Sequence, residues 1–151
     1  MILTIRPAQP QDAQGLAKLN REFNGKNVAS AQETAGALSQ PGPEKVLLAC
    51  VGGEPVGFLC GLVYRSACYW GACAQVTELY VTPAHRRQGV ARGLVERFLE
   101  ACRQMGVSEV TLLTGKENVS GRAFYESMGF TPTQEVHYCL SLREESKPLV
   151  N

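Results

Sequence analysis

The sequence lacks a strong charge of either sign. Its 151 residues carry a formal net charge of only +1, and no basic or acidic tail is present. Proteins that bind nucleic acid usually carry a clustered excess of lysine and arginine. The composition therefore does not favour nucleic acid as a partner, and any bound anion must be held by local geometry.

Long apolar runs are also missing. No stretch approaches the roughly 20 apolar residues of a membrane-spanning helix. The first residues, Met1 to Pro7, contain no charged leader before an apolar core. A chain of this length can bury about two thirds of its unfolded surface. We therefore predict one soluble domain over residues 1–151, cytoplasmic and without a membrane partner, with 143–151 as a loose tail.

The sequence contains no Cys-x-x-Cys pair, and both histidines, His85 and His137, stand apart from the cysteines. This spacing predicts no zinc site and no other metal site. Most of the cysteines lie within apolar runs, which is typical of small core residues in a reduced intracellular protein. The six are Cys50, Cys60, Cys68, Cys73, Cys102 and Cys139.

Two familiar phosphate-binding patterns are absent as well. The segment from Gly89 to Gly93 does not give the Gly-x-Gly-x-x-Gly order of a dinucleotide fingerprint. Gly115-Lys116 follows a strand-like run but lacks the upstream glycine and the following Ser or Thr of a nucleotide P-loop. Neither NAD nor ATP is therefore predicted as a ligand.

What the sequence does contain is a β-type run, Leu79-Tyr80-Val81, followed by a basic turn and an amphipathic helix. The turn and first helical residues are Arg86, Arg87, Gln88, Gly89, Val90 and Ala91. The first N–H groups of a helix lack internal partners and carry partial positive charge, so they favour a phosphate. Gly89 permits a close backbone approach. The alternative is a plain turn with solvated arginines.

Strands and helices alternate along the rest of the chain. Apolar periodicity and turn residues predict strands at 3–6, 45–51, 55–63, 73–81, 109–114 and 134–142. They predict helices that begin at Pro10-Gln11-Asp12, at Ser30, at Gln88 to Val90 and at Asn118. Gly52-Gly53 indicates a hairpin, and Gly129-Phe130 indicates a helix C-terminal cap with an apolar contact.

Three segments together resemble a known family. Arg86-x-x-Gly89-x-Ala91, preceded by Leu79-Tyr80-Val81-x-Pro83, resembles the acetyl-coenzyme A motif of the GNAT N-acetyltransferase superfamily. Ile5-Arg6-Pro7-Ala8 with Asp12-Ala13 is similar to its first strand and helix cap, and Asn118 with Ala123 to Phe130 is similar to its second cofactor motif. The resemblance implies an α/β single-domain fold, with a mixed central sheet of about six to seven strands flanked by about four helices.

The resemblance also implies a reaction, in which an acetyl group passes from acetyl-coenzyme A to a primary amine by direct attack. An alkylammonium must lose a proton before it attacks, and Glu78 is the predicted base or ammonium binder. Tyr125 is the predicted acid for the leaving thiolate. The structural alternatives are a solvent-facing strand residue for Glu78 and a tyrosine at the edge of the core for Tyr125.

The predicted coenzyme contacts follow from the same motifs. The backbone amides of Leu79 and Val81 are expected to bind the pantetheine arm, which would lie beside the strand. Asn118 is expected near the pantetheine or diphosphate, or else it caps its helix. The full predicted set is Leu79, Tyr80, Val81, Arg86, Arg87, Gln88, Gly89, Val90, Ala91, Asn118, Phe124 and Tyr125.

The acceptor amine is not identified by the sequence. By resemblance it is shaped by residues 20–40 and 64–74, and the second segment carries Tyr64, Arg65, Tyr69 and Trp70. This aromatic and basic group suits a small-molecule or peptidic amine, and equally suits an edge loop or a homodimer contact. A non-catalytic acyl-coenzyme A sensing module is the alternative function. The presence of both predicted catalytic side chains favours the enzyme.

Overall fold

The computed structural model describes residues 1–143. The expected tail lies, from residue 144 onward, outside the described residues. The chain forms two compact units, Met1–Leu113 and a second one that begins at Thr114. Among the residues described, no helix is long and apolar enough to cross a membrane.

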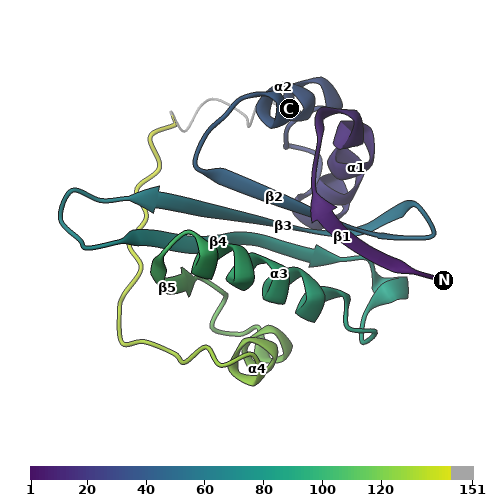
Figure 1. Ribbon diagram of the computed structural model, residues 1–151. Coiled ribbons are helices and arrows are strands. Elements are labelled where there is room, and N and C mark those ends of the chain that lie inside the picture. The colour runs from purple at the N-terminus through teal and green to yellow at the C-terminus, as the bar shows by residue number, and fades with distance from the viewer. Residues whose placement is uncertain (144–151) are drawn as a thin grey trace. The chain divides into compact units, whose positions relative to one another are not determined.

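The first unit is built on a mixed sheet with the strand order β1-β2-β3-β4-β5 (Figure 1). Neighbouring strands from β1 to β4 are antiparallel, and β5 runs parallel to β4. Gly52 and Gly53 form the β2–β3 turn, as the sequence predicts. The strands are β1 (Leu3–Pro7), β2 (Glu44–Val51), β3 (Glu54–Arg65), β4 (Ala72–Val81) and β5 (Val107–Leu112).

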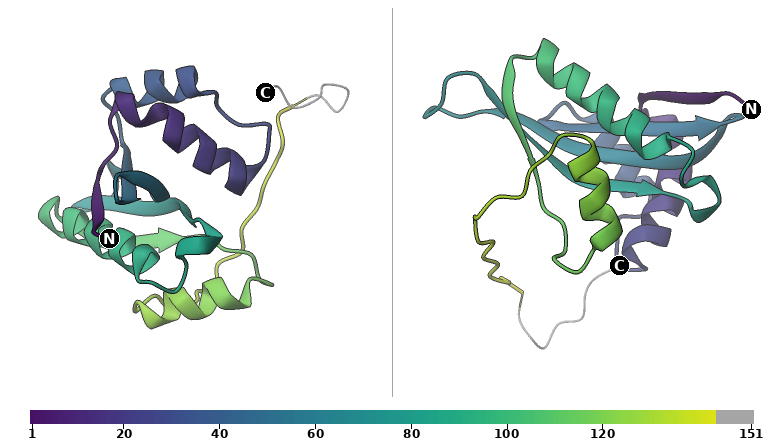
Figure 2. Two further views of the ribbon diagram at one scale, coloured as in Figure 1. Left: turned by 90° about the vertical axis from the view of Figure 1, so that its right-hand side faces the viewer. Right: turned by 90° about the horizontal axis from the view of Figure 1, so that it is seen from below.

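Three helices of the first unit cover the two faces of this sheet. Helices α1 (Ala13–Asn24) and α2 (Ala31–Ser39) lie on one side, and α3 (Val90–Gln104) lies on the other (Figure 2). A short 3-10 turn, Pro10–Asp12, leads into α1. Ser30 and Glu33 form a reciprocal capping box that fixes the start of α2, where the sequence predicts it.

The apolar faces of α1 and α3 pack on opposite sides of the sheet and form the core. Leu16 and Leu19 of α1 pack in one cluster with Leu48, Phe58 and Tyr80 of the sheet. On the opposite face, α3 buries its periodic apolar residues, which are Val90, Leu94, Val95, Phe98 and Cys102. Strand β4 is therefore held between helices on both faces, and the turn that follows it begins from a rigid support.

The second unit contains α4 (Val119–Ser127). The Asn118 side chain accepts a hydrogen bond from the Gly121 amide at 3.1 Å and so caps the helix. At the other end, the Gly129 and Phe130 amides donate to the carbonyls of Glu126 and Tyr125, at 3.1 and 3.0 Å. These two bonds form a Schellman cap, and the predicted cap at Gly129-Phe130 is confirmed.

The predicted strand at 134–142 is wrong in this structure. The segment has no strand assignment, and its alternating residues Val136, Tyr138 and Leu140 are 72–88% exposed. A strand needs a neighbour to complete its hydrogen-bond ladder, and no described strand pairs with this segment. The sheet of the described residues accordingly has five strands instead of six to seven, while the mixed α/β fold and the four α-helices are confirmed.

Candidate active site

The turn between β4 and α3 has the backbone geometry of an anion cradle. Arg87 and Gly89 both adopt left-handed conformations, with φ values of 60° and 83°. Gly89 is the N-cap of α3, and no side chain caps the helix there. A Cβ built on Gly89 meets no atom within 4 Å. The start of α3 therefore lacks a capping side chain and leaves room at Gly89, which suits a phosphate group.

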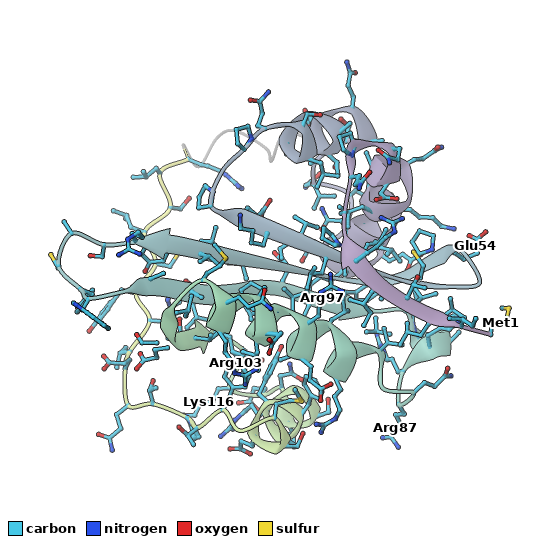
Figure 3. All side chains as sticks on the ribbon, in the orientation of Figure 1. Met1, Glu54, Arg87, Arg97, Arg103 and Lys116 are labelled. Carbon is cyan, nitrogen blue, oxygen red and sulfur yellow. The ribbon has the colours of Figure 1, made fainter. Side chains whose placement is uncertain are left out.

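The two arginines of this turn are used differently. Arg86 donates its Nε to the Val81 carbonyl at 2.9 Å, and its guanidinium carbon lies 5.7 Å from the centre of the Tyr80 ring. Arg87 is exposed and extends away from the fold at the tip of the turn (Figure 3). Arg86 thus fastens the turn to β4, whereas Arg87 presents its charge outward.

The edge of β4 that leads into the turn has no strand partner beyond its midpoint. Pairing with β5 ends at Val76, while pairing with β3 continues to Val81. A register shift leaves Thr77 as an extra residue, because Cys60 faces Glu78 and Gly61 faces Val76. Residues 77–81 therefore have one edge to which no described strand bonds.

The direction of the amides along this edge follows from one hydrogen bond. The Thr82 amide donates to the Val56 carbonyl of β3 at 2.8 Å. Because amides alternate in direction along a strand, those of Leu79 and Val81 point away from β3. The sequence predicts that these two amides bind a pantetheine arm, and their orientation is compatible with that role.

Glu78 lies half-buried on the face of the sheet that carries α1. Its Oε2 is 3.5 Å from Asn24 Nδ2, and the same Asn24 nitrogen donates to Asn20 Oδ1 at 2.7 Å. Among the described residues Glu78 belongs to no ion pair. The carboxylate is thus available to accept a proton or to bind an ammonium group.

Tyr80, two residues further along β4, belongs to the core and is only 9% exposed. Its hydroxyl donates to Glu22 Oε2 at 3.2 Å, and the Phe23 ring stacks on its own ring at 5.0 Å. Burial and the nearby Glu22 carboxylate raise the pKa of its phenol. Whether Tyr80 also contacts a coenzyme stays a prediction.

Within the second unit, Tyr125 lies between two aromatic rings. Its ring centre is 5.4 Å from that of Phe124 and 6.0 Å from that of Phe130. Tyr125 and Phe130 are also joined by a backbone hydrogen bond of the Schellman cap, so the cap fixes the position of Tyr125. Burial raises the pKa of the Tyr125 phenol, which therefore keeps its proton at neutral pH.

Most of the loop between β3 and β4, within the predicted acceptor segment 64–74, is exposed, whereas Ala72 and Ala74 of the same segment are buried. Tyr69 and Trp70 are 72% and 97% exposed, and with Arg65 and Met105 they line a shallow pocket of about 410 Å³. A larger pocket of about 630 Å³ lies elsewhere, between the end of α2, the start of β2 and α3. Neither of these two pockets is lined by residues of the β4–α3 turn, so the predicted coenzyme site is defined by backbone geometry.

Three of the cysteines have thiols that burial keeps protonated. All six are free, and burial raises the pKa of Cys60 to about 12. Burial also raises the pKa values of Cys50 and Cys102, so these three thiols stay protonated at neutral pH. Their position agrees with the core role that the sequence predicts.

Four residues near Glu78 and Tyr80 are not predicted individually from the sequence, and all of them come from the end of α1. They are Asn20, Glu22, Phe23 and Asn24. The only local signal is the spacing of the two asparagines, which lie one helical turn apart. Their contacts with β4 join residues separated by 54 to 58 positions, a relation that local patterns do not reveal.

Comparison with known proteins identifies the family. A model of the acetyltransferase (GNAT) family matches residues 14–130. The chain belongs to this family. The match includes α1 from its second residue onward, the β4–α3 turn and α4, so the predicted resemblance to GNAT N-acetyltransferases is confirmed.

Individual GNAT relatives are consistent with this assignment. Human N-acetyltransferase 8 is 44% identical over 69 residues, which cover 46% of this chain and 30% of that protein. The chain spans less than half the length of the curated relatives it matches first. The local match agrees with membership of the acetyltransferase (GNAT) family.

Solved GNAT structures share the fold. A ribosomal-protein-alanine N-acetyltransferase from Brucella melitensis biovar Abortus 2308 superposes with a TM-score of 0.81 at 22% identity, covering 94% of this chain and 100% of its own. The enzyme AAC(6')-Iy, solved with the bisubstrate analogue CoA-S-monomethyl-acetylneamine, gives 0.82 at 19% identity and covers 93% and 99%. At these identities the likeness establishes the fold alone.

Proposed function

We propose that this GNAT chain is an N-acetyltransferase that moves the acetyl group of acetyl-coenzyme A to a primary amine. The observation that carries the proposal is the continuity of an open strand edge, at residues 77–81, with a left-handed turn and an uncapped helix N-terminus. An extended arm beside the strand and a diphosphate at the helix would be bound by one continuous run of backbone amides.

The residues of the turn fit the coenzyme diphosphate. The first amides of α3 would donate to its oxygens, Arg87 would add a full charge, and the space at Gly89 would admit the phosphate. The amides of Leu79 and Val81 would hold the pantetheine arm, and either could polarise the thioester carbonyl. Such positioning supplies much of the acceleration in transfer reactions.

The protein side chains then manage two protons. Glu78 accepts a proton from the acceptor ammonium, directly or through a water molecule, and the amine nitrogen attacks the thioester carbon. As the C–S bond breaks, Tyr125 donates its phenol proton to the leaving thiolate, and the proton that the attacking nitrogen still has to lose restores the phenol, so that the products are the amide, the free thiol and the proton held by Glu78. The raised pKa of Tyr125 supports this acid role, because the phenol is protonated before each turnover.

The proposed acceptor is an amine. Because Glu78 belongs to no ion pair with the described residues, it favours an acceptor that is positively charged before it reacts. One solved GNAT neighbour is an aminoglycoside acetyltransferase in complex with sisomicin, and another bears the name of an enzyme that acetylates a ribosomal protein. A small-molecule screen and a peptide screen are therefore both warranted.

Calorimetric titration with acetyl-coenzyme A, with ATP and NAD as controls, tests the proposal first. We expect micromolar binding of acetyl-coenzyme A alone, followed by thiol release when an amine panel is added. Binding without thiol release for any amine would favour the sensing module. Absence of binding would contradict the coenzyme assignment and the enzymatic function with it.

A further inference from the structure

The last turn of α1 is attached to β4 by two consecutive side chains of the same sheet face. Tyr80 donates to Glu22 at 3.2 Å and carries the Phe23 ring at 5.0 Å. Glu78 faces Asn24 at 3.5 Å. The position of this helix end therefore depends on Tyr80, and the helix end in turn lies against the proposed base.

Tyr80 is also attached to the coenzyme turn. Arg86 places its guanidinium carbon 5.7 Å from the centre of the Tyr80 ring while its Nε is bound to the Val81 carbonyl. A cation near an aromatic face is attracted to it, and this attraction holds Arg86 and Tyr80 together. The Tyr80 ring thus contacts both the turn and the end of α1.

We propose that Tyr80 is a positioning residue that couples the coenzyme turn to the last turn of α1. An anion bound by the amides of the turn would hold the turn, and with it Arg86, in place. Arg86 would hold the Tyr80 ring, and the Tyr80 hydroxyl would hold Glu22. The end of α1 beside Glu78, where the acceptor amine would enter, would then open less often when the coenzyme is bound. This inference rests on the proposed function, because it takes acetyl-coenzyme A as the ligand of the turn.

Hydrogen–deuterium exchange tests this coupling without knowledge of the acceptor. Acetyl-coenzyme A should slow amide exchange in peptides covering 83–95, and it should also slow exchange in peptides covering 19–30. In Tyr80→Phe, acetyl-coenzyme A should still slow exchange at 83–95. The protection that it gives at 19–30 should fall about fivefold. That factor corresponds to a hydrogen bond of about 1 kcal/mol.

A double-variant comparison separates coupling from general weakening. Glu22→Ala removes the other partner of the same hydrogen bond. The double variant that carries Tyr80→Phe and Glu22→Ala should therefore lose no more protection at 19–30 than either single variant does. Lys18→Ala, on an exposed position of α1, and Tyr138→Phe, at an exposed tyrosine, are the matched controls. Both should retain the full coenzyme-dependent protection.

The outcomes distinguish this inference from the function it rests on. If acetyl-coenzyme A protects neither segment, the coenzyme assignment fails. If it protects 83–95 but not 19–30, or if Tyr80→Phe keeps full protection at 19–30, the coupling is refuted while the proposed function stands. Loss of protection at 19–30 in both single variants, without further loss in the double variant, supports the coupling.

Discussion

Replacement of Gly89 by alanine separates the conformational role of this glycine from its role in ligand binding. At φ 83° a Cβ is strained by about 1–2 kcal/mol, although no atom lies within 4 Å of it. Gly53, in the β2–β3 turn, is a matched control, because its φ is 84° and its Cβ also meets nothing. Both alanine variants should lose similar stability, with thermal midpoints lower by roughly 2–8 °C.

Coenzyme affinity should respond only at Gly89. A methyl group there occupies the space above the first amides of α3 and displaces a phosphate oxygen from at least one donor. A hydrogen bond to a charged group contributes about 1.5–3 kcal/mol, so affinity for acetyl-coenzyme A should fall about 10- to 100-fold. Titration calorimetry and thermal unfolding of both variants provide the measurement. Equal affinities for Gly89→Ala and Gly53→Ala would refute the placement of the diphosphate at this turn.

Four further changes have expected outcomes. Arg87→Gly removes the strain of a non-glycine residue in the left-handed region, so it should raise the stability of the fold by up to about 1 kcal/mol in a thermal-shift assay. The same change removes a positive charge from the turn, so acetyl-coenzyme A should bind more weakly and its affinity should depend less on salt, as titration at two ionic strengths would show. Tyr125→Phe should bind acetyl-coenzyme A within a few fold of wild type while transfer slows by roughly 10²-fold or more in a thiol-release assay; full turnover would remove the acid role. Glu78→Gln should alter the pH–rate profile of the acidic limb, and an unchanged profile would exclude Glu78 as the base. Arg6 holds the pKa of Asp12 below its ordinary value, so this ion pair stabilises the fold above about pH 4 and is lost as pH falls through the lowered pKa. Asp12→Asn should therefore reduce urea stability at pH 7 more than at pH 3, and an equal loss at both would contradict the ion-pair explanation.

Local patterns predicted the elements that local interactions determine. The apolar rhythm after Gly89 predicts a helix that begins near Val90, and α3 begins there. Gly129 with Phe130 predicts the cap that ends α4, because a Schellman cap needs only residues within two turns of the helix. Ser30 similarly precedes α2 as its N-cap.

Patterns that depend on a distant partner were less informative. The alternation of Val136, Tyr138 and Leu140 is typical of a strand, yet alternation specifies a face and does not supply the neighbouring strand. Likewise, nothing near Tyr80 in the sequence indicates that Glu22 accepts its hydrogen bond. Contacts of this kind are determined by how α1 packs on the sheet.

The candidate site itself shows why motif and geometry must be combined. The motif predicts the turn, because Arg87 and Gly89 are adjacent to a helix start, but it does not predict that pairing with β5 stops at Val76. That early end, together with the extra residue Thr77, leaves the amides of Leu79 and Val81 pointing to an edge with no described strand partner. A backbone site of this kind tolerates many side chains along β4, since the donors belong to the main chain. Substitutions at Leu79 that preserve the strand should consequently alter coenzyme affinity far less than the single methyl group added at Gly89.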